Sequence, residues 1–203
     1  MEQRTHSDLR ADAAEPRVRR AVARSVQGAL IERGVWSDVR KRMLEIAPDA
    51  LRELDASEPS EWMTVAGHIA LIDAACDVCG VEGMRALGRD RILGLATGAF
   101  FPSIVGSWTR TFQTARDIVQ IFPHLWRASG QNTGELVTQE IGETRAVFRF
   151  EHLHPSVAGC LGWRSTIEGM ATGLFERVKL ECEAQATPMP DGTAVEFTVS
   201  WKP

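Results

Sequence analysis

Apolar and polar residues alternate along four segments in the C-terminal part of the chain. The segments cover residues 136–141, 144–151, 177–186 and 193–201. In the last of them Val195, Phe197 and Val199 share one face, and alternation with period two is typical of an antiparallel sheet with one wet face. Short turns at 142–143 and 188–192 join the segments in pairs. The pattern therefore predicts two β-hairpins.

Helical spacing of apolar residues predicts the rest of the architecture. One helix is expected between the hairpins, at 154–175, and its glycines indicate close packing against another backbone. The N-terminal helices are expected at 16–33, 37–47, 60–79, 82–96 and 103–121. We expect Pro16 in a first helical turn, and Pro48 and Pro123 as helix breaks. The predicted fold class is α+β, with an N-terminal helical layer followed by a β-hairpin–helix–β-hairpin four-stranded antiparallel sheet.

Composition narrows the classes of protein that the chain can represent. The chain has 203 residues, of which 44% are hydrophobic and 25% charged, and a net charge of −4. We expect a disordered leader over 1–15 and a single domain over 16–203. The acidic balance argues against nucleic-acid binding, and no segment is long and apolar enough to span a membrane. The lack of an apolar signal segment and the scattered cysteines favour a cytoplasmic protein with reduced thiols.

The cysteines form one short motif, Cys76-Asp77-Val78-Cys79. A redox pair needs a helix N-terminus to lower the thiol pKa, but this pair is expected at a helix C-terminus. A zinc site would need two more ligands, and the spacing to Cys160 and Cys182 matches no zinc module. We expect Cys76 and Cys79 to be reduced and structural, and metal binding by them stays open as an alternative.

Two histidines, His152 and His154, lie where the second predicted strand meets the next helix. Their spacing in an extended segment could hold a metal or the edge of a haem, but a polar strand edge that caps a helix explains it as well. His68 falls within the third predicted helix, at the margin of its apolar stripe. Because no catalytic motif is present, we expect no enzymatic activity, no catalytic residue and no resident cofactor or metal.

An apolar pocket between the helices and the sheet is the preferred candidate site. The expected lining consists of large apolar side chains from two predicted helices and the last strand: Trp108, Phe112, Trp163, Ile167, Met170 and Phe197. A solid core would use the same residues, so the pattern alone leaves both readings open.

Short apolar motifs in 155–201 carry a family resemblance. They include the glycine-bearing helix with Gly169 and Gly173, and the last strand that ends in Phe-x-Val-x-Trp at Trp201. Together with Trp62 and Leu87-Gly88-Arg89, this pattern resembles a family, known mostly from myxobacteria, of the superfamily of TRAPP-like, haem-NO-binding-like and vinyl-reductase-like ligand-binding domains. The resemblance covers about residues 18–203.

The resemblance implies a non-enzymatic module that senses a small molecule or binds a protein, and pairing of helices into a homodimer. The haem-dependent nitric-oxide sensors of the superfamily use a Tyr-x-Ser-x-Arg haem signature. The chain contains no tyrosine, so the resemblance predicts that haem is not bound. The alternative is a haem- or metal-binding sensor, or an enzyme, that uses His152, His154 or the cysteines.

Overall fold

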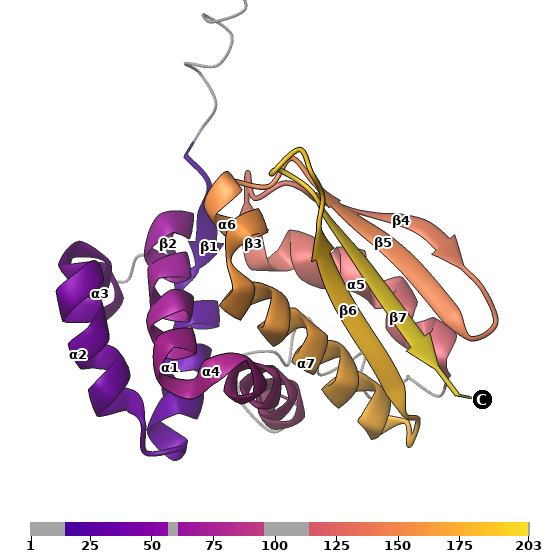
Figure 1. Ribbon diagram of the computed structural model, residues 1–203, viewed down its shortest axis with the longest axis horizontal. Helices are drawn as coiled ribbons and strands as arrows, with labels where there is room; N and C mark the ends of the chain where they lie inside the picture. The colour runs from indigo at the N-terminus through magenta and orange to yellow at the C-terminus, as the bar shows by residue number, and fades with distance from the viewer. Residues whose placement is uncertain (1–14, 57–60, 96–113, 203) are drawn as a thin grey trace, which may run out of the picture.

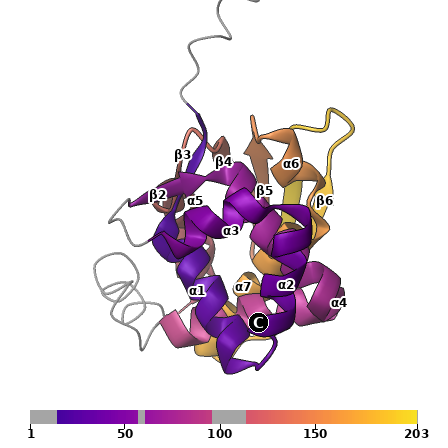
Figure 2. The same cartoon turned by 90° about the vertical axis from the view of Figure 1, so that its left-hand side faces the viewer.

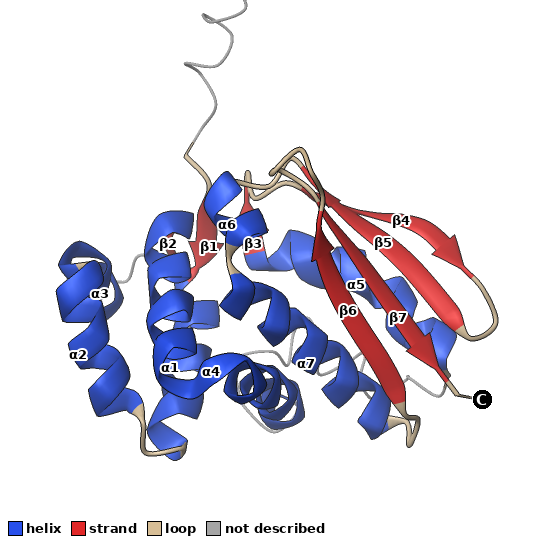
Figure 3. Cartoon of the chain, in the orientation of Figure 1, coloured by secondary structure: helices blue, strands red, loops and turns tan. Residues whose placement is uncertain are grey.

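The computed structural model describes residues 15–56, 61–95 and 114–202. Three parts can be followed in Figure 1: an N-terminal group of helices, the later helices that pack beside this group and against the sheet, and a four-stranded sheet. Figure 3 shows the same succession, with the red strands of the larger sheet gathered at one side of the blue helices. The predicted α+β class and the order of its parts are confirmed.

The N-terminal group consists of α1 (Arg20–Glu32), α2 (Trp36–Ile46), α3 (Pro48–Asp55) and α4 (Val65–Leu95). Gly80 interrupts α4 with φ of 70°, which divides it into two helices at the predicted position. Gly34, with φ of 71°, ends the turn after α1. Figure 2 looks onto this group, with α1, α2 and α3 in front.

A small sheet changes the predicted start of this group. Strand β1 (Arg17–Arg19) pairs with β2 (Trp62–Thr64) and with β3 (Gly130–Gln131), in the order β2-β1-β3. Pro16 therefore precedes a strand, and the helix that we predicted from Pro16 begins only at Arg20. Such two- and three-residue strands are too short to give a readable alternation.

Two prolines differ from their predicted roles, one in part and one entirely. Pro48 stops α2, as predicted, but it also occupies the first turn of α3, which the prediction missed. Pro123 lies inside α5 (Ala115–Ser129) and does not end it. Thr114 and Asp117 form a capping box at the start of α5, so the helix begins there within the described chain. The rest of the helix predicted over 103–121 falls outside the described residues, as does the leader.

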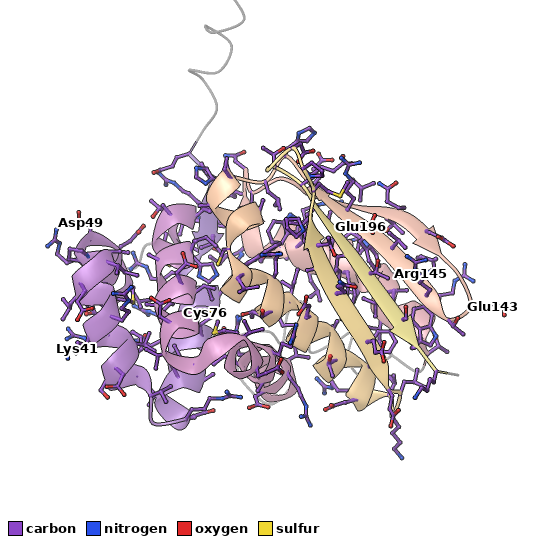
Figure 4. All side chains as sticks on the ribbon, in the orientation of Figure 1. Lys41, Asp49, Cys76, Glu143, Arg145 and Glu196 are labelled. Carbon is purple, nitrogen blue, oxygen red and sulfur yellow. The ribbon has the colours of Figure 1, made fainter. Side chains whose placement is uncertain are left out.

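The larger sheet has the order β4-β5-β7-β6, and all of its pairs are antiparallel. Its strands are β4 (Glu135–Ile141), β5 (Arg145–Glu151), β6 (Cys182–Pro188) and β7 (Val195–Trp201). Phe148 faces Phe197 across β5 and β7, and both are buried on the helix side. Figure 4 labels Arg145 and Glu196, both exposed, on the same two strands. One apolar and one wet face result, as the alternation predicted.

The helix between the hairpins is divided and longer than predicted. It consists of α6 (Pro155–Gly159) and α7 (Leu161–Arg177), separated at Cys160. Because α7 continues to Arg177 and Lys179 takes a positive φ of 61°, β6 begins only at Cys182. The strand that we predicted from residue 177 was therefore five residues too early at its start, although its inward residues Cys182 and Ala184 were assigned correctly.

Helix α7 packs closely against the second half of α4, and we call this contact the α4–α7 seam (residues 81–95 with 161–177). A Cβ atom on Gly88 would overlap with the carbonyl oxygen of Thr166, and one on Gly169 would overlap with that of Arg85. Two backbones can approach this closely only where side chains are missing. The predicted reason for the glycines of this helix, close packing of another backbone, is the one observed.

Ion pairs border the seam on its polar side. Arg85 Nε donates to Glu168 at 2.8 Å, and Arg89 Nε donates to Glu176 at 2.8 Å. Glu168 is buried, and its other oxygen accepts from the backbone N–H of Ala186 in β6 at 2.9 Å. One carboxylate thus connects α4, α7 and the sheet.

Candidate functional site

A cavity of about 150 Å³ lies between the helices and the larger sheet. Its walls come from elements spread over the described chain: β1 and α1, both halves of α4, α5, α6, α7 and strands β3, β4, β5 and β7. Most of the lining is apolar. The apolar residues that face it include Val22, Ile69, Ile72, Phe122, Leu125, Val157, Ala171 and Leu174.

Aromatic rings form one wall of this cavity. Trp126, Phe150 and Trp163 contact one another edge to face, with ring centroids 5.0 to 5.8 Å apart. Phe122 and Phe197 extend the wall along the sheet, with centroids 5.8 Å apart. Such edge-to-face pairs stabilise a fixed arrangement of rings. The wall is therefore a shaped surface that a flat apolar molecule can contact.

Trp126 also forms a hydrogen bond that joins the aromatic wall to a neighbouring turn. Its Nε1–H donates to the carbonyl oxygen of Gly134 at 3.0 Å, in the turn that leads into β4. Gly134 has φ of 86° and lies close to the backbone of Glu151 and His152. The aromatic wall of the cavity is thereby hydrogen-bonded to the turn that precedes β4, the first strand of the larger sheet.

His68 is one of two ionisable residues on the cavity wall. It lies in the first half of α4 and is only 8% exposed, and its Nδ1 atom has no hydrogen-bond partner. Burial, followed by the positive charge of Arg91, lowers the pKa of His68 to about 3. The imidazole is consequently neutral at physiological pH, with one ring nitrogen free for a ligand.

Arg91, in the second half of α4, is the other ionisable residue of the lining. It is 7% exposed and donates to Ser25 Oγ at 2.7 and 3.1 Å and to the carbonyl oxygen of Val22 at 3.3 Å. Burial lowers the pKa of Arg91 to about 10, so the guanidinium keeps its charge at neutral pH. These bonds hold the cation against α1, and Arg91 belongs to the cavity lining.

Four of the six residues that we predicted for a pocket do line this cavity: Trp163, Ile167, Met170 and Phe197. That they bind a ligand remains a prediction. Trp108 and Phe112 lie outside the described residues. Sequence reasoning did not select His68 or Arg91. His68 could have been selected as a titratable residue beside the apolar stripe of a predicted helix, because a buried titratable residue is a candidate for function.

The two histidines proposed for a metal or haem edge lie away from the cavity lining. His154 caps α6, with its Nδ1 atom 2.7 Å from Ser156 Oγ, as expected for a polar strand edge. His152 is exposed and has φ of 56°. Within the described ranges, no group of three or more His, Cys, Asp or Glu side chains is placed to hold a metal ion.

All four cysteines are free thiols. Cys76, labelled on α4 in Figure 4, and Cys79 are partly buried, and burial is the main cause that raises the pKa of each. Cys160 is buried and donates to Asp73 at 3.0 Å, which together with burial raises its pKa further. Thiols with raised pKa values are poor nucleophiles and poor metal ligands. Their surroundings agree with the structural role that we predicted.

No helix among the described residues is long and apolar enough to cross a membrane. The chain matches no protein-family model and no curated protein. Solved structures of H-NOX domains do match it over most of its length. An Fe(II) unliganded H-NOX protein from K. algicida is 10% identical, with a TM-score of 0.64, over 91% of this chain and 97% of that one.

Two further H-NOX structures match over the same share of the chain. The Fe(II)NO form of an H-NOX protein from S. oneidensis is 12% identical with a TM-score of 0.62, over 91% of this chain and 99% of that one. An oxygen-binding H-NOX domain related to soluble guanylate cyclases is 12% identical with a TM-score of 0.60, over 91% and 95%. At such identities the likeness concerns the fold. The chain therefore has the fold of the H-NOX domains.

Proposed function

We propose that this chain is a sensory domain that binds a small molecule in the cavity between its helices and its larger sheet, without catalysing a reaction. The observation that carries the proposal is the buried Nδ1 atom of His68, which has no hydrogen-bond partner and belongs to a residue on a mostly apolar wall. Buried polar atoms are satisfied in most proteins, and one without a partner calls for an explanation such as a missing ligand. An apolar cavity with a few polar groups is the usual form of a small-molecule site.

The position of the cavity suits a sensor. Its lining includes both halves of α4, so a bound molecule would contact the N-terminal helices and the sheet at once. Trp126 connects the same wall to the turn before β4 through its bond to Gly134. A ligand that favours one arrangement of these parts over another shifts their equilibrium by its difference in affinity for the two.

The cavity volume sets the size of the first probes. An engineered cavity of 150 Å³ lined by apolar residues binds benzene or xenon, so toluene is a suitable neutral probe. We expect toluene to raise the thermal midpoint of the protein and to shift NMR signals of the cavity lining. An Ala171→Leu variant, which fills the cavity, should lose this response. Ala70→Leu is the matched control, because Ala70 lies on α4 without lining the cavity. An unchanged response in Ala171→Leu would contradict the proposal.

A haem-based gas sensor is the second candidate, and the comparisons support it better than they support a purely apolar pocket. Several of the matching structures are Fe(II) H-NOX proteins. His68 offers a neutral, partner-free nitrogen, which is the form of imidazole that binds iron. The cavity volume does not suit a haem. Pockets for drug-sized ligands have roughly 300–1,000 Å³, and a haem is a large ligand. The cavity between the described residues has about 150 Å³.

A hemin titration separates the two candidates. For the small-molecule sensor we expect no sharp, stoichiometric Soret band. A stoichiometric complex that is lost in His68→Phe and kept in His154→Phe would establish the haem sensor in its place. His154 is the matched control because it is exposed and caps α6 away from the cavity.

Self-association is a further part of the proposal. The resemblance predicts a homodimer through the helices, and the large apolar side chains most exposed on the described chain are Ile31, Leu44, Ile46 and Leu161, all on helices. Light scattering over a range of micromolar concentrations tests this. A mass near 22.4 kDa at every concentration would contradict it.

A further inference from the structure

Arg91 is a buried cation without a buried anion beside it. Its hydrogen bonds go to Ser25 Oγ and to the carbonyl oxygen of Val22, which are neutral acceptors. No carboxylate of residues 15–56, 61–95 or 114–202 forms an ion pair with it. Transfer of a charge into an apolar interior is costly unless the charge is paired. The site therefore favours an anion.

Neighbouring arginines on the same half of α4 show the usual solution. Arg85 pairs with Glu168 and Arg89 pairs with Glu176, both at 2.8 Å, and both arginines are about half exposed. Arg91 is far more buried than either, yet it lacks the carboxylate that they have. Of these three arginines, Arg91 has the greatest need of a counter-charge, and it is the one that lines the cavity.

His68 shares the cavity wall with Arg91. Burial and, after it, the charge of Arg91 lower the pKa of His68. Both line the cavity, and the Nδ1 atom of His68 is buried without a partner. A carboxylate can engage both residues, because it accepts from the guanidinium of Arg91 and from an N–H of the neutral His68 ring. Most of the remaining wall is aromatic or aliphatic, with Trp126, Phe150 and Trp163 as its largest side chains.

We propose that the cavity selects a small carboxylic acid in its anionic form, with the carboxylate on Arg91 and His68 and the apolar body against the aromatic wall. This inference rests on the proposed function and names its ligand class. A guanidinium matches a planar carboxylate with two parallel hydrogen bonds. A single cation balances one negative charge, which favours a monocarboxylate over a phosphate or a dicarboxylate. The volume of about 150 Å³ sets its size at one aromatic ring or a short alkyl chain.

Three probes of similar shape test the inference: benzoate, its neutral analogue benzamide, and toluene. Calorimetric titration of the full chain at pH 7 should give an affinity for benzoate at least about 10-fold higher than for benzamide, as expected for hydrogen bonds to a charged group. In Arg91→Gln the affinity for benzoate should fall by about 10-fold or more, while that for benzamide changes by less than about 3-fold.

Arg89→Gln is the matched control for Arg91→Gln. It removes the same charge from the same half of α4, but from a side chain that pairs with Glu176 at the surface. Both affinities should stay at the wild-type level in this variant. Since Arg91 also bonds to α1, Arg91→Gln could fail to fold, and NMR of the wild-type arginine Nε–H groups then gives the second readout: benzoate should shift the Arg91 signal and leave that of Arg89 in place.

The outcomes separate the two levels of the proposal. Toluene binding without a preference for benzoate over benzamide would overturn the carboxylate inference and leave the small-molecule sensor standing. A preference for benzoate that survives in Arg91→Gln would also overturn it. Binding of none of the three probes would overturn both the inference and the proposed function.

Discussion

The two sides of α7 are built in opposite ways. Toward the second half of α4, the seam has glycines where the backbones meet and ion pairs along its border, with no room for one further carbon atom. Toward α5 and the sheet, the same helix contributes Trp163, Ile167 and Met170 to a wall that leaves a cavity of about 150 Å³. One helix face is thus packed as tightly as backbones allow, and the other is left unfilled.

This difference indicates which part of the molecule is a fixed frame and which part can respond. A close-packed interface transmits small shifts because it cannot absorb them. The side chains that line a cavity can change their packing at low cost in free energy, because they have no contacts on the cavity side to lose. Substitutions on the two sides of α7 should therefore differ in their energetic cost as the sides differ in geometry.

The largest expected effect is that of a methyl group placed in the seam. Gly169→Ala puts a Cβ atom on the carbonyl oxygen of Arg85, so α4 and α7 must separate. We expect a loss of about 3 kcal/mol or more in the free energy of unfolding, at the upper end of the cost of overpacking. Urea denaturation measures it. Gly159→Ala is the control, because nothing lies within 4 Å of a Cβ atom there. Equal effects of the two variants would contradict the tight seam.

Removal of the buried carboxylate of the seam should come next. Glu168→Ala leaves the N–H of Ala186 without its acceptor and Arg85 without its main partner. Removal of a buried, hydrogen-bonded carboxylate in this way lowers the free energy of unfolding by about 3 kcal/mol. Glu176→Ala removes the more exposed pair with Arg89 and should cost about 1 kcal/mol or less. Denaturation of both variants under the same conditions gives the difference, and a larger cost for Glu176→Ala would reverse our assignment.

On the cavity side, the stability of the protein should depend on pH through His68. The folded-state pKa of about 3 lies below the ordinary value of 6.5, so the unfolded chain takes up the proton first as pH falls. Stability is therefore full above pH 6.5 and is lost progressively down to about pH 3, with a loss of about 2 kcal/mol between pH 7 and pH 5. His68→Phe should flatten this part of the profile, whereas His154→Phe should not. A parallel profile for wild type and His68→Phe would show that His68 is not buried as described.

The smallest effect is expected where a side chain grows into the cavity. Ala171→Val adds two methyl groups beside a void, so the cost of overpacking should be absent and stability should change by less than about 1 kcal/mol. Thermal and urea denaturation of this variant, set beside Gly169→Ala two residues away, give the sharpest comparison of the two sides of α7. A loss as large as that of Gly169→Ala would mean that the cavity side is packed like the seam.

The sequence was most informative where one physical pattern decided the structure. Alternation along 193–201 identified β7 and its buried face, and the glycines of α7 indicated the seam. It was least informative where short-range signals compete. Pro48 can end one helix and begin the next, and Pro123 is accommodated inside α5, since the tertiary contacts of a helix can outweigh the local cost of proline.

The candidate site was only half predictable for a similar reason. Large apolar residues such as Trp163 and Phe197 could be assigned to the space between helices and sheet, because their spacing fixes which face they share. His68 and Arg91 are separated by 23 positions in the sequence and come together only because α4 bends at Gly80. No pattern along the chain reports that two polar residues of different helical segments face one cavity.

The aromatic wall has one practical consequence for the study of this protein. The chain has six tryptophans and no tyrosine, and two of the tryptophans, Trp126 and Trp163, form the wall itself. Its ultraviolet emission is therefore free of a tyrosine background and contains two indoles that a guest in the cavity would touch. The protein thus carries an intrinsic fluorophore at the candidate site, and occupancy can be followed in real time without a label.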